Sequence, residues 1–195
     1  MNKIFDTQQL DEALLLLHEQ LELHNAPHSE IVVCGGSALI AIGLVSRTTR
    51  DVDVVALMHR GELKHSEPLP EHIQQAATKV SEILGLPDDW LNCGPASQLS
   101  MGLPQGFQSR LHRKEIGEKL VVHYIDRTDQ IYFKTFAAAD RGGYHISDLK
   151  ALNPSEDELL QAARWCMTQD ISEGFRFILK EMLIISGWNH VAERI

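Results

Sequence analysis

The sequence has few cysteines and no long apolar run, which removes several classes of protein from consideration. Its three cysteines form no CxxC pair, so neither a disulfide framework nor a cysteine zinc site is expected. No apolar stretch approaches the roughly 18 residues that a membrane-spanning helix needs. The N-terminal segment also lacks the small-residue cleavage site of a secretory signal. We therefore expect a cytoplasmic protein with no membrane partner.

Basic residues are in the minority. The chain has 18 lysines and arginines against 27 aspartates and glutamates, which gives a formal net charge of −9. Such a charge repels a polyanion at long range, so non-specific binding to duplex DNA is not expected. One basic cluster lies between residues 110 and 119, where it is either a contact for RNA or phosphate or the solvated surface of a hairpin.

The chain does contain an alternation of helix and strand patterns. Leucines at helical spacing over 7–24 predict an N-terminal helix packed on the core, capped by Asp6 or Thr7. We expect one α/β (α+β) domain over 1–195, a short mixed sheet flanked by helices, with its core at 28–152. The next elements are a buried strand, a glycine turn, a helix and a second strand, at 31–34, 35–36, 37–44 and 51–57.

The second half of the chain reads as loop, hairpin and helices. A helix over 71–84 precedes a glycine- and proline-rich stretch to residue 106, interpreted as a flexible lid or specificity loop. Two strand-like arms flank Gly117 and predict a hairpin over 110–125 that joins the sheet. A helix over 128–141 comes next. The C-terminal helical extension, 155–190, is opened by two predicted capping boxes, Ser155 with Glu158 and Asp170 with Glu173.

The glycine turn has the composition of a phosphate-binding site. Without a Cβ at Gly35 and Gly36, the backbone can approach a phosphate closely. The next helix would direct free N–H groups and its positive dipole end at the anion, and Ser37 would add a hydroxyl donor. A glycine turn after a strand is also a common tight connection. The residues of the second strand are therefore needed to distinguish a phosphate-binding turn from a simple connection.

The second strand begins with two acids at alternate positions. Because successive side chains on a strand point to opposite faces, Asp51 and Asp53 should project to the same side. Two carboxylates about 4 Å apart repel by roughly 4 kcal/mol at an effective dielectric constant near 20, unless a cation lies between them. Their oxygens suit Mg²⁺ or Mn²⁺ that bridges to substrate phosphates. The alternative is a pair of solvated acids at the end of a strand.

Together, these two halves resemble the signature of the polymerase-β-like nucleotidyltransferase superfamily. Gly36 and Ser37 are followed by thirteen residues and then by Asp-Val-Asp-Val at 51–54. With Arg47 and Thr49 before the acids, the segment is similar to a bacterial branch that includes abortive-infection and toxin–antitoxin nucleotidyltransferases. The resemblance implies the nucleotidyltransferase fold and a catalytic, metal-holding role for the two acids. It also implies nucleotide contacts from Gly35, Gly36, Ser37, Arg47 and Thr49.

The same branch carries a downstream helix with a lysine and a following acid, which match Lys134 and Asp148 here. The resemblance implies that both take part in catalysis. Arg141 lies within about 20° of Lys134 around a helix of 3.6 residues per turn, so both cations can face one phosphate group. Alternatively, Lys134 extends from a packed helix into water, and Asp148 caps or ends a helical turn.

Many members of the superfamily place a third carboxylate on a later strand, where it acts as the general base. The strand-like segment over 120–125 instead supplies His123 and Tyr124, with Asp126 just beyond it. The base therefore has no assignment from the sequence.

These expectations define an enzyme and two alternatives. The expected reaction transfers a nucleotidyl group from a nucleoside triphosphate to a hydroxyl of RNA, protein or a small molecule, with Mg²⁺ or Mn²⁺. A toxin of a toxin–antitoxin system, neutralised by an antitoxin partner, would share this chemistry. A catalytically silent nucleotide-binding or interaction protein of the same fold is the second alternative. Neither GxGxxG nor GxxxxGK[ST] comes after the first strand, which argues against a Rossmann dehydrogenase and a P-loop kinase.

Overall fold

The computed structural model describes residues 5–45 and 48–195. The chain divides into two compact units, each of which is described by itself. The first comprises the described residues up to Leu103 together with Gln108–Ile125, and the second comprises Pro104–Phe107 and Asp126–Ile195. The boundary after Ile125 falls inside the range that the sequence predicts as one core. Within the described ranges, no helix combines the length and the apolar character needed to cross a bilayer.

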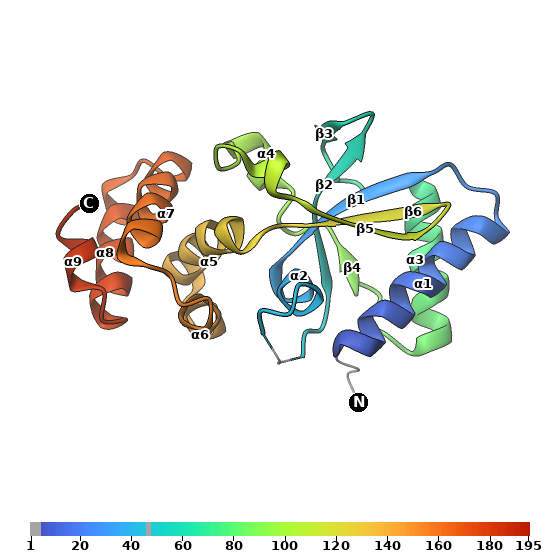
Figure 1. The fold of residues 1–195 in the computed structure, drawn as a ribbon, viewed down its shortest axis with the longest axis horizontal. Coiled ribbons are helices and arrows are strands. Elements are labelled where there is room, and N and C mark those ends of the chain that lie inside the picture. The colour runs from blue at the N-terminus through green and yellow to red at the C-terminus, as the bar shows by residue number, and fades with distance from the viewer. Residues whose placement is uncertain (1–4, 46–47) are drawn as a thin grey trace. The chain divides into compact units, whose positions relative to one another are not determined.

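The first unit is built on a mixed sheet, which contains six strands among the described residues (Figure 1). The strand order is β3-β2-β1-β6-β5, and β4 lies beside β2. Strand β1 is antiparallel to β2 and parallel to β6, and β5 and β6 form the predicted hairpin. This confirms an α/β fold with a mixed sheet flanked by helices. The strands are β1 Ser29–Cys34, β2 Val52–His59, β3 Glu62–Lys64, β4 Leu91–Asn92, β5 His112–Gly117 and β6 Leu120–Tyr124.

The helices of the first unit begin where the sequence provides a cap or a turn. Asp6 caps α1 by accepting from the Gln9 backbone N–H, which confirms one of the two predicted caps. Helix α2 starts at Gly35, two residues earlier than predicted, so both glycines of the turn are helical. The α-helices are α1 Thr7–Leu23, α2 Gly35–Ala41, α3 Glu71–Leu84 and α4 Ser97–Met101. A 3₁₀ helix spans Phe107–Arg110, and its first residue belongs to the second unit.

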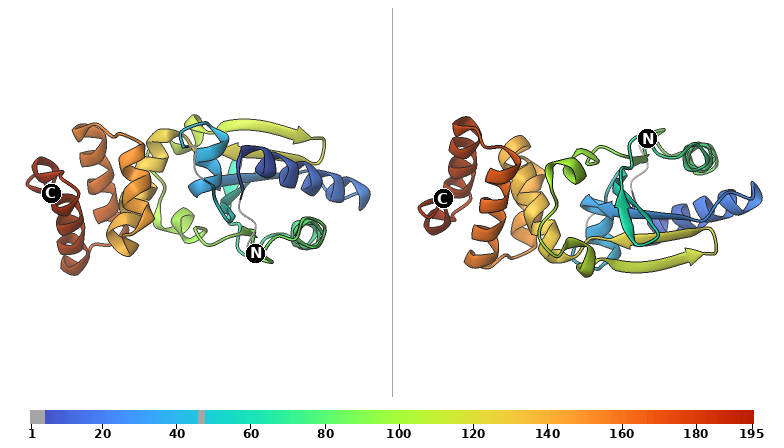
Figure 2. Two further views of the ribbon diagram at one scale, coloured as in Figure 1. Left: turned by 90° about the horizontal axis from the view of Figure 1, so that it is seen from below. Right: turned by 90° about the horizontal axis from the view of Figure 1, so that it is seen from above.

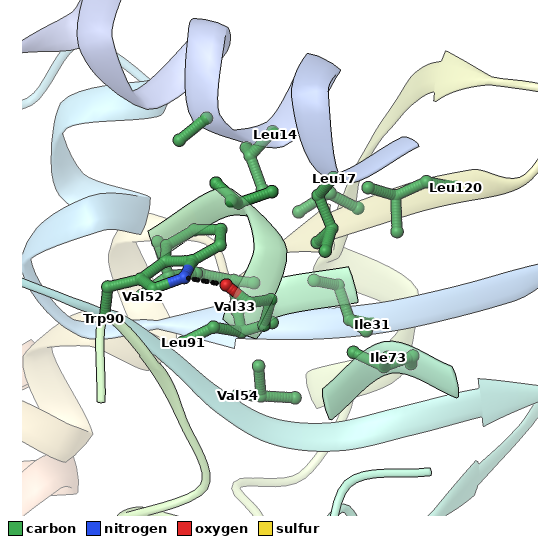
Figure 3. Close-up of a cluster of buried hydrophobic side chains, with 14 of the residues drawn as sticks. Leu14, Leu17, Ile31, Val33, Val52, Val54, Ile73, Trp90, Leu91 and Leu120 are labelled. Atoms are coloured by element: carbon green, nitrogen blue, oxygen red, sulfur yellow. Dashed lines mark hydrogen bonds between the residues drawn. The ribbon is translucent and has the colours of Figure 1, made fainter. Parts of the chain in front are cut away.

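One face of the sheet packs against α1 and α3 and forms the apolar core (Figure 3). Each large side chain buried here contributes about 1.5–3 kcal/mol relative to exposure. The Trp90 indole N–H donates to the Ala77 carbonyl at 3.0 Å and thereby ties the segment before β4 to α3. Side chains of this core include Leu14 and Leu17 of α1, Ile31 and Val33 of β1, Val52 and Val54 of β2, and Ile73 of α3.

Tyr124 of β6 belongs to the same core, and removal of its hydroxyl tests whether this group contributes to stability. Its side chain is 2% exposed, its hydroxyl has no hydrogen-bond partner among the described residues, and burial raises its pKa. We therefore expect Tyr124→Phe to leave the free energy of unfolding unchanged, or to raise it by up to about 1 kcal/mol, in urea denaturation. Ser66→Ala is the matched control, because the buried Ser66 hydroxyl donates to the Val54 carbonyl at 3.0 Å. A larger loss for Tyr124→Phe than for Ser66→Ala would contradict this account.

The second unit is helical apart from its turns (Figure 2). The capping box of Ser155 with Glu158 is confirmed at the start of α7. The second predicted box is wrong: Ser172 caps α8 by accepting from the Phe175 N–H, and Asp170 instead accepts from the Ser172 N–H at 2.8 Å. The helices are α5 Arg127–Arg141, α6 Tyr144–Ala151, α7 Glu156–Gln169, α8 Glu173–Ile185 and α9 Asn189–Ala192.

An ion pair joins α5 to α7 within this unit. The Arg127 guanidinium donates to Glu158 at 2.6 Å and also to the Leu152 carbonyl at 2.7 Å. The hydrogen bond from Arg127 lowers the pKa of Glu158 to about 2. Arg127 therefore fixes both the start of α7 and the turn that precedes it.

Candidate active site

The two halves of the predicted site meet at one edge of the sheet. Because β1 and β2 are antiparallel, the end of β1 lies beside the start of β2, and Cys34 pairs with Asp53. Helix α2 leaves β1 directly at Gly35, so its first turn adjoins the start of β2 (Figure 1). The glycine turn and the acids are therefore neighbours in space.

Gly35 and Asp53 are in direct contact. Gly35 has a φ of +72°, a backbone conformation that residues with a Cβ rarely adopt. A Cβ at Gly35 would occupy the space in which the Asp53 Oδ2 atom lies. Glycine is thus required at this position both for its backbone conformation and for the close approach of the carboxylate.

The acids alternate with core residues at the start of β2. Val52 and Val54 are fully buried against α1 and α3, whereas Asp53 is partly exposed on the opposite face. Asp51 immediately precedes the strand and is also partly exposed. This alternation is the burial pattern expected if both carboxylates lie on one side.

Thr49 orients Asp51. The Thr49 side chain is buried, and its hydroxyl donates to Asp51 Oδ1 at 3.3 Å. Its backbone is held by reciprocal hydrogen bonds with Phe5, the residue before the cap of α1. Thr49 therefore has a positioning role that does not depend on a nucleotide. Arg47, predicted to contact the nucleotide, lies outside the described residues.

Gly36 and Ser37 form the buried first turn of α2. The Ser37 side chain is fully buried, and its hydroxyl donates to the Cys34 carbonyl at 3.3 Å. This bond joins the helix start to the end of β1. A phosphate contact by Ser37 remains a prediction, and it would require the hydroxyl to turn away from Cys34.

A third polar side chain beside the acids was missed by sequence reasoning. Strand β4 runs parallel to β2 and pairs Asn92 with Asp53 and Leu91 with Val52. The Val52 N–H donates to the Trp90 carbonyl at 2.6 Å, which extends the pairing by one residue. The sequence predicts an irregular loop over this stretch, because a two-residue strand is too short to show a periodic pattern.

Strand β6, where a third acid was sought, is separated from β2 by β1. His123 of β6 lies with its Nε2 atom 2.6 Å from Glu30 of β1. Partial burial raises the pKa of Glu30, but hydrogen bonds with His123 and His28 outweigh it, so the net pKa is lowered. His123 is thus occupied by a structural partner, and no general base is identified on β6.

The remaining predicted site residues belong to the second unit. Lys134 donates to Asp148 at 2.7 Å, and the two side chains are only 6% and 3% exposed. The Lys134 ammonium also lies 5.6 Å from the centre of the Tyr144 ring. Arg141, in contrast, has a side chain that is 66% exposed, with Asp140 at 3.3 Å. The two cations expected to share one phosphate therefore lie in different surroundings.

The carboxylates of Asp51 and Asp53 are candidate ligands for a divalent ion. Among the described residues, no group of three or more histidine, cysteine, aspartate or glutamate side chains is arranged to hold a metal ion. Mg²⁺ is commonly held by one or two carboxylates, with water and substrate phosphates completing its shell. Asp51 and Asp53 fit this second mode, in which the nucleotide itself supplies ligands.

A comparison with protein families identifies a match that covers most of the chain. The model of a family described as "Nucleotidyltransferase of unknown function (DUF6036)" matches residues 12–163. This range contains the glycine turn, the paired acids, Lys134 and Asp148, and it ends within α7. No curated protein and no solved structure matches the chain.

Proposed function

The chain belongs to this family of nucleotidyltransferases, and from that premise we propose that Asp51 and Asp53 hold a divalent cation for nucleotidyl transfer. The donor would be a nucleoside triphosphate and the acceptor a hydroxyl of RNA, protein or a small molecule. The bond between the acceptor oxygen and the α-phosphorus would form as the bond to the β-phosphate oxygen breaks. Pyrophosphate would leave, and the proton of the acceptor hydroxyl would pass to solvent.

The contact between Gly35 and Asp53 is the observation that supports this proposal most directly. It brings the first backbone amides of α2 next to a carboxylate that alternates with core residues. An anion held only by the amides would be repelled by that carboxylate, so an intervening cation is needed for both to act together.

Each residue then has a defined task. A bound Mg²⁺ or Mn²⁺ would neutralise charge on the phosphates and polarise the α-phosphorus. Asp51, held by Thr49, and Asp53, held against Gly35, would fix the position of the ion. We propose that Gly36 and Ser37 border the triphosphate, whereas a contact of Arg141 with it stays a prediction from the sequence. Lys134 and Asp148 would support the fold of α5 and α6, because each already has a buried partner.

Calorimetric titration with ATP, GTP, CTP and UTP tests the site. We expect Mg²⁺-dependent binding of the preferred nucleotide, and we expect Asp51→Asn or Asp53→Asn to weaken it about tenfold to a hundredfold, since each removes a charged ligand of the ion. Glu82→Gln is the control, because Glu82 is an exposed acid on α3 paired with Lys79. Equal affinity in wild type, Asp51→Asn and Asp53→Asn would remove the proposed site.

A second candidate function is nucleotide binding without turnover. It is favoured by the neighbour of Asp53 on β4, which is an asparagine and therefore no general base. Binding of nucleotide with no transfer to RNA, protein or water would support it. A toxin acting on tRNA or on another protein would instead show transfer to that acceptor and would be neutralised by an antitoxin partner.

A further inference from the structure

Asn92 lies on the face of the sheet that bears the paired acids. In a parallel ladder, paired residues project to the same side, and Asn92 pairs with Asp53. Leu91 faces the core together with Val52 (Figure 3), so Asn92 must face the other way. The Asn92 side chain is partly exposed and is therefore accessible to a ligand.

The hydrogen bonds of Asn92 determine which end of its amide is available. Its Oδ1 atom accepts from the Gly94 N–H at 2.8 Å, which closes a turn directly after β4. Its Nδ2 atom reaches the Asp89 carbonyl only at 3.5 Å, beyond the usual range for such a bond. An amide NH₂ group carries two protons, so Asn92 keeps at least one N–H that it can donate to a ligand.

We propose that Asn92 donates this N–H to a phosphate oxygen of the nucleoside triphosphate and so helps to position it. The inference rests on the proposed function of Asp51 and Asp53. An ion held by Asp53 would bring a phosphate oxygen of the nucleotide close to this carboxylate. The neighbouring strand is about 4.8 Å away, which puts a donor on β4 within reach of that oxygen.

Two substitutions separate this role from closure of the turn. Asn92→Ser keeps an acceptor for the Gly94 N–H but shortens the side chain, so its hydroxyl no longer reaches the nucleotide. Asn92→Asp keeps the shape and the turn, but it replaces the donor with a negative charge beside Asp53. Thermal denaturation of both variants checks that the turn and the fold persist.

Titrations with the four nucleoside triphosphates in Mg²⁺, and with Mn²⁺ alone, give the readout. We expect Asn92→Ser to weaken triphosphate binding about tenfold or more with unchanged Mn²⁺ affinity, as for loss of a hydrogen bond to a charged group. We expect Asn92→Asp to bind Mn²⁺ severalfold more tightly, because a third carboxylate joins the site. If Asp53→Asn binds the triphosphate weakly but Asn92→Ser binds it with wild-type affinity, the inference about Asn92 is overturned. If Asp53→Asn also binds normally, the proposed function itself fails.

Discussion

Gly35→Ala should abolish most Mg²⁺-dependent binding of nucleoside triphosphate, with an expected loss of about a hundredfold. The new Cβ would collide with the carboxylate of Asp53 and push it away from the first turn of α2. Displacement of a site group by about 1 Å is sufficient for an effect of this size. Calorimetric titration with the preferred nucleotide measures the loss.

Alanine at Gly35 also lowers the free energy of unfolding, because it has to adopt a positive φ. A control variant is needed to separate this effect from the collision with Asp53. Gly43 supplies the control, because its φ is +74° and a Cβ there meets nothing within 4 Å. Both substitutions should lower the free energy of unfolding by about 1 kcal/mol or somewhat more. Only Gly35→Ala should impair the binding of nucleotide. Equal affinities in the two variants would show that the approach of Asp53 to Gly35 has no role in the site.

The main features of the site arise from local sequence. A strand, a glycine turn and a second strand with alternating acids are close in the chain, and antiparallel pairing of the two strands brings their ends together. The hydrophobic alternation of Val52 and Val54 fixes which face the acids take. The proximity of the glycine turn to the acids was therefore predictable from a single segment of the chain.

Features that depend on longer connections were not predictable. Asn92 reaches Asp53 through a two-residue strand held by Trp90, and nothing in its neighbours indicates the pairing. The spacing of Asp170 and Glu173 predicts a capping box at the start of α8, but Ser172 is the residue whose side chain accepts from the helix. Both features depend on the path of the backbone, which the residue types in these segments do not determine.

The Lys134–Asp148 pair is another example, since it spans a turn containing Gly142 and Gly143 whose course the sequence does not reveal. The side chains are buried, so removal of one charge leaves the other in a medium of low dielectric constant. We expect Lys134→Met to lower the free energy of unfolding by about 3–5 kcal/mol, measured by urea denaturation. Arg141→Met, which removes an exposed cation from the same helix, should change it by no more than about 0.5 kcal/mol.

Replacement of both partners separates packing from a direct contact with nucleotide. Lys134→Met combined with Asp148→Leu leaves no uncompensated charge, so much of the lost stability should return. If the pair only joins α5 to α6, the double variant should also bind nucleotide with wild-type affinity. Restored stability without restored affinity would instead show that the Lys134 ammonium acts on the nucleotide. A Lys134→Met variant as stable as Arg141→Met would show that the buried pair does not support the fold.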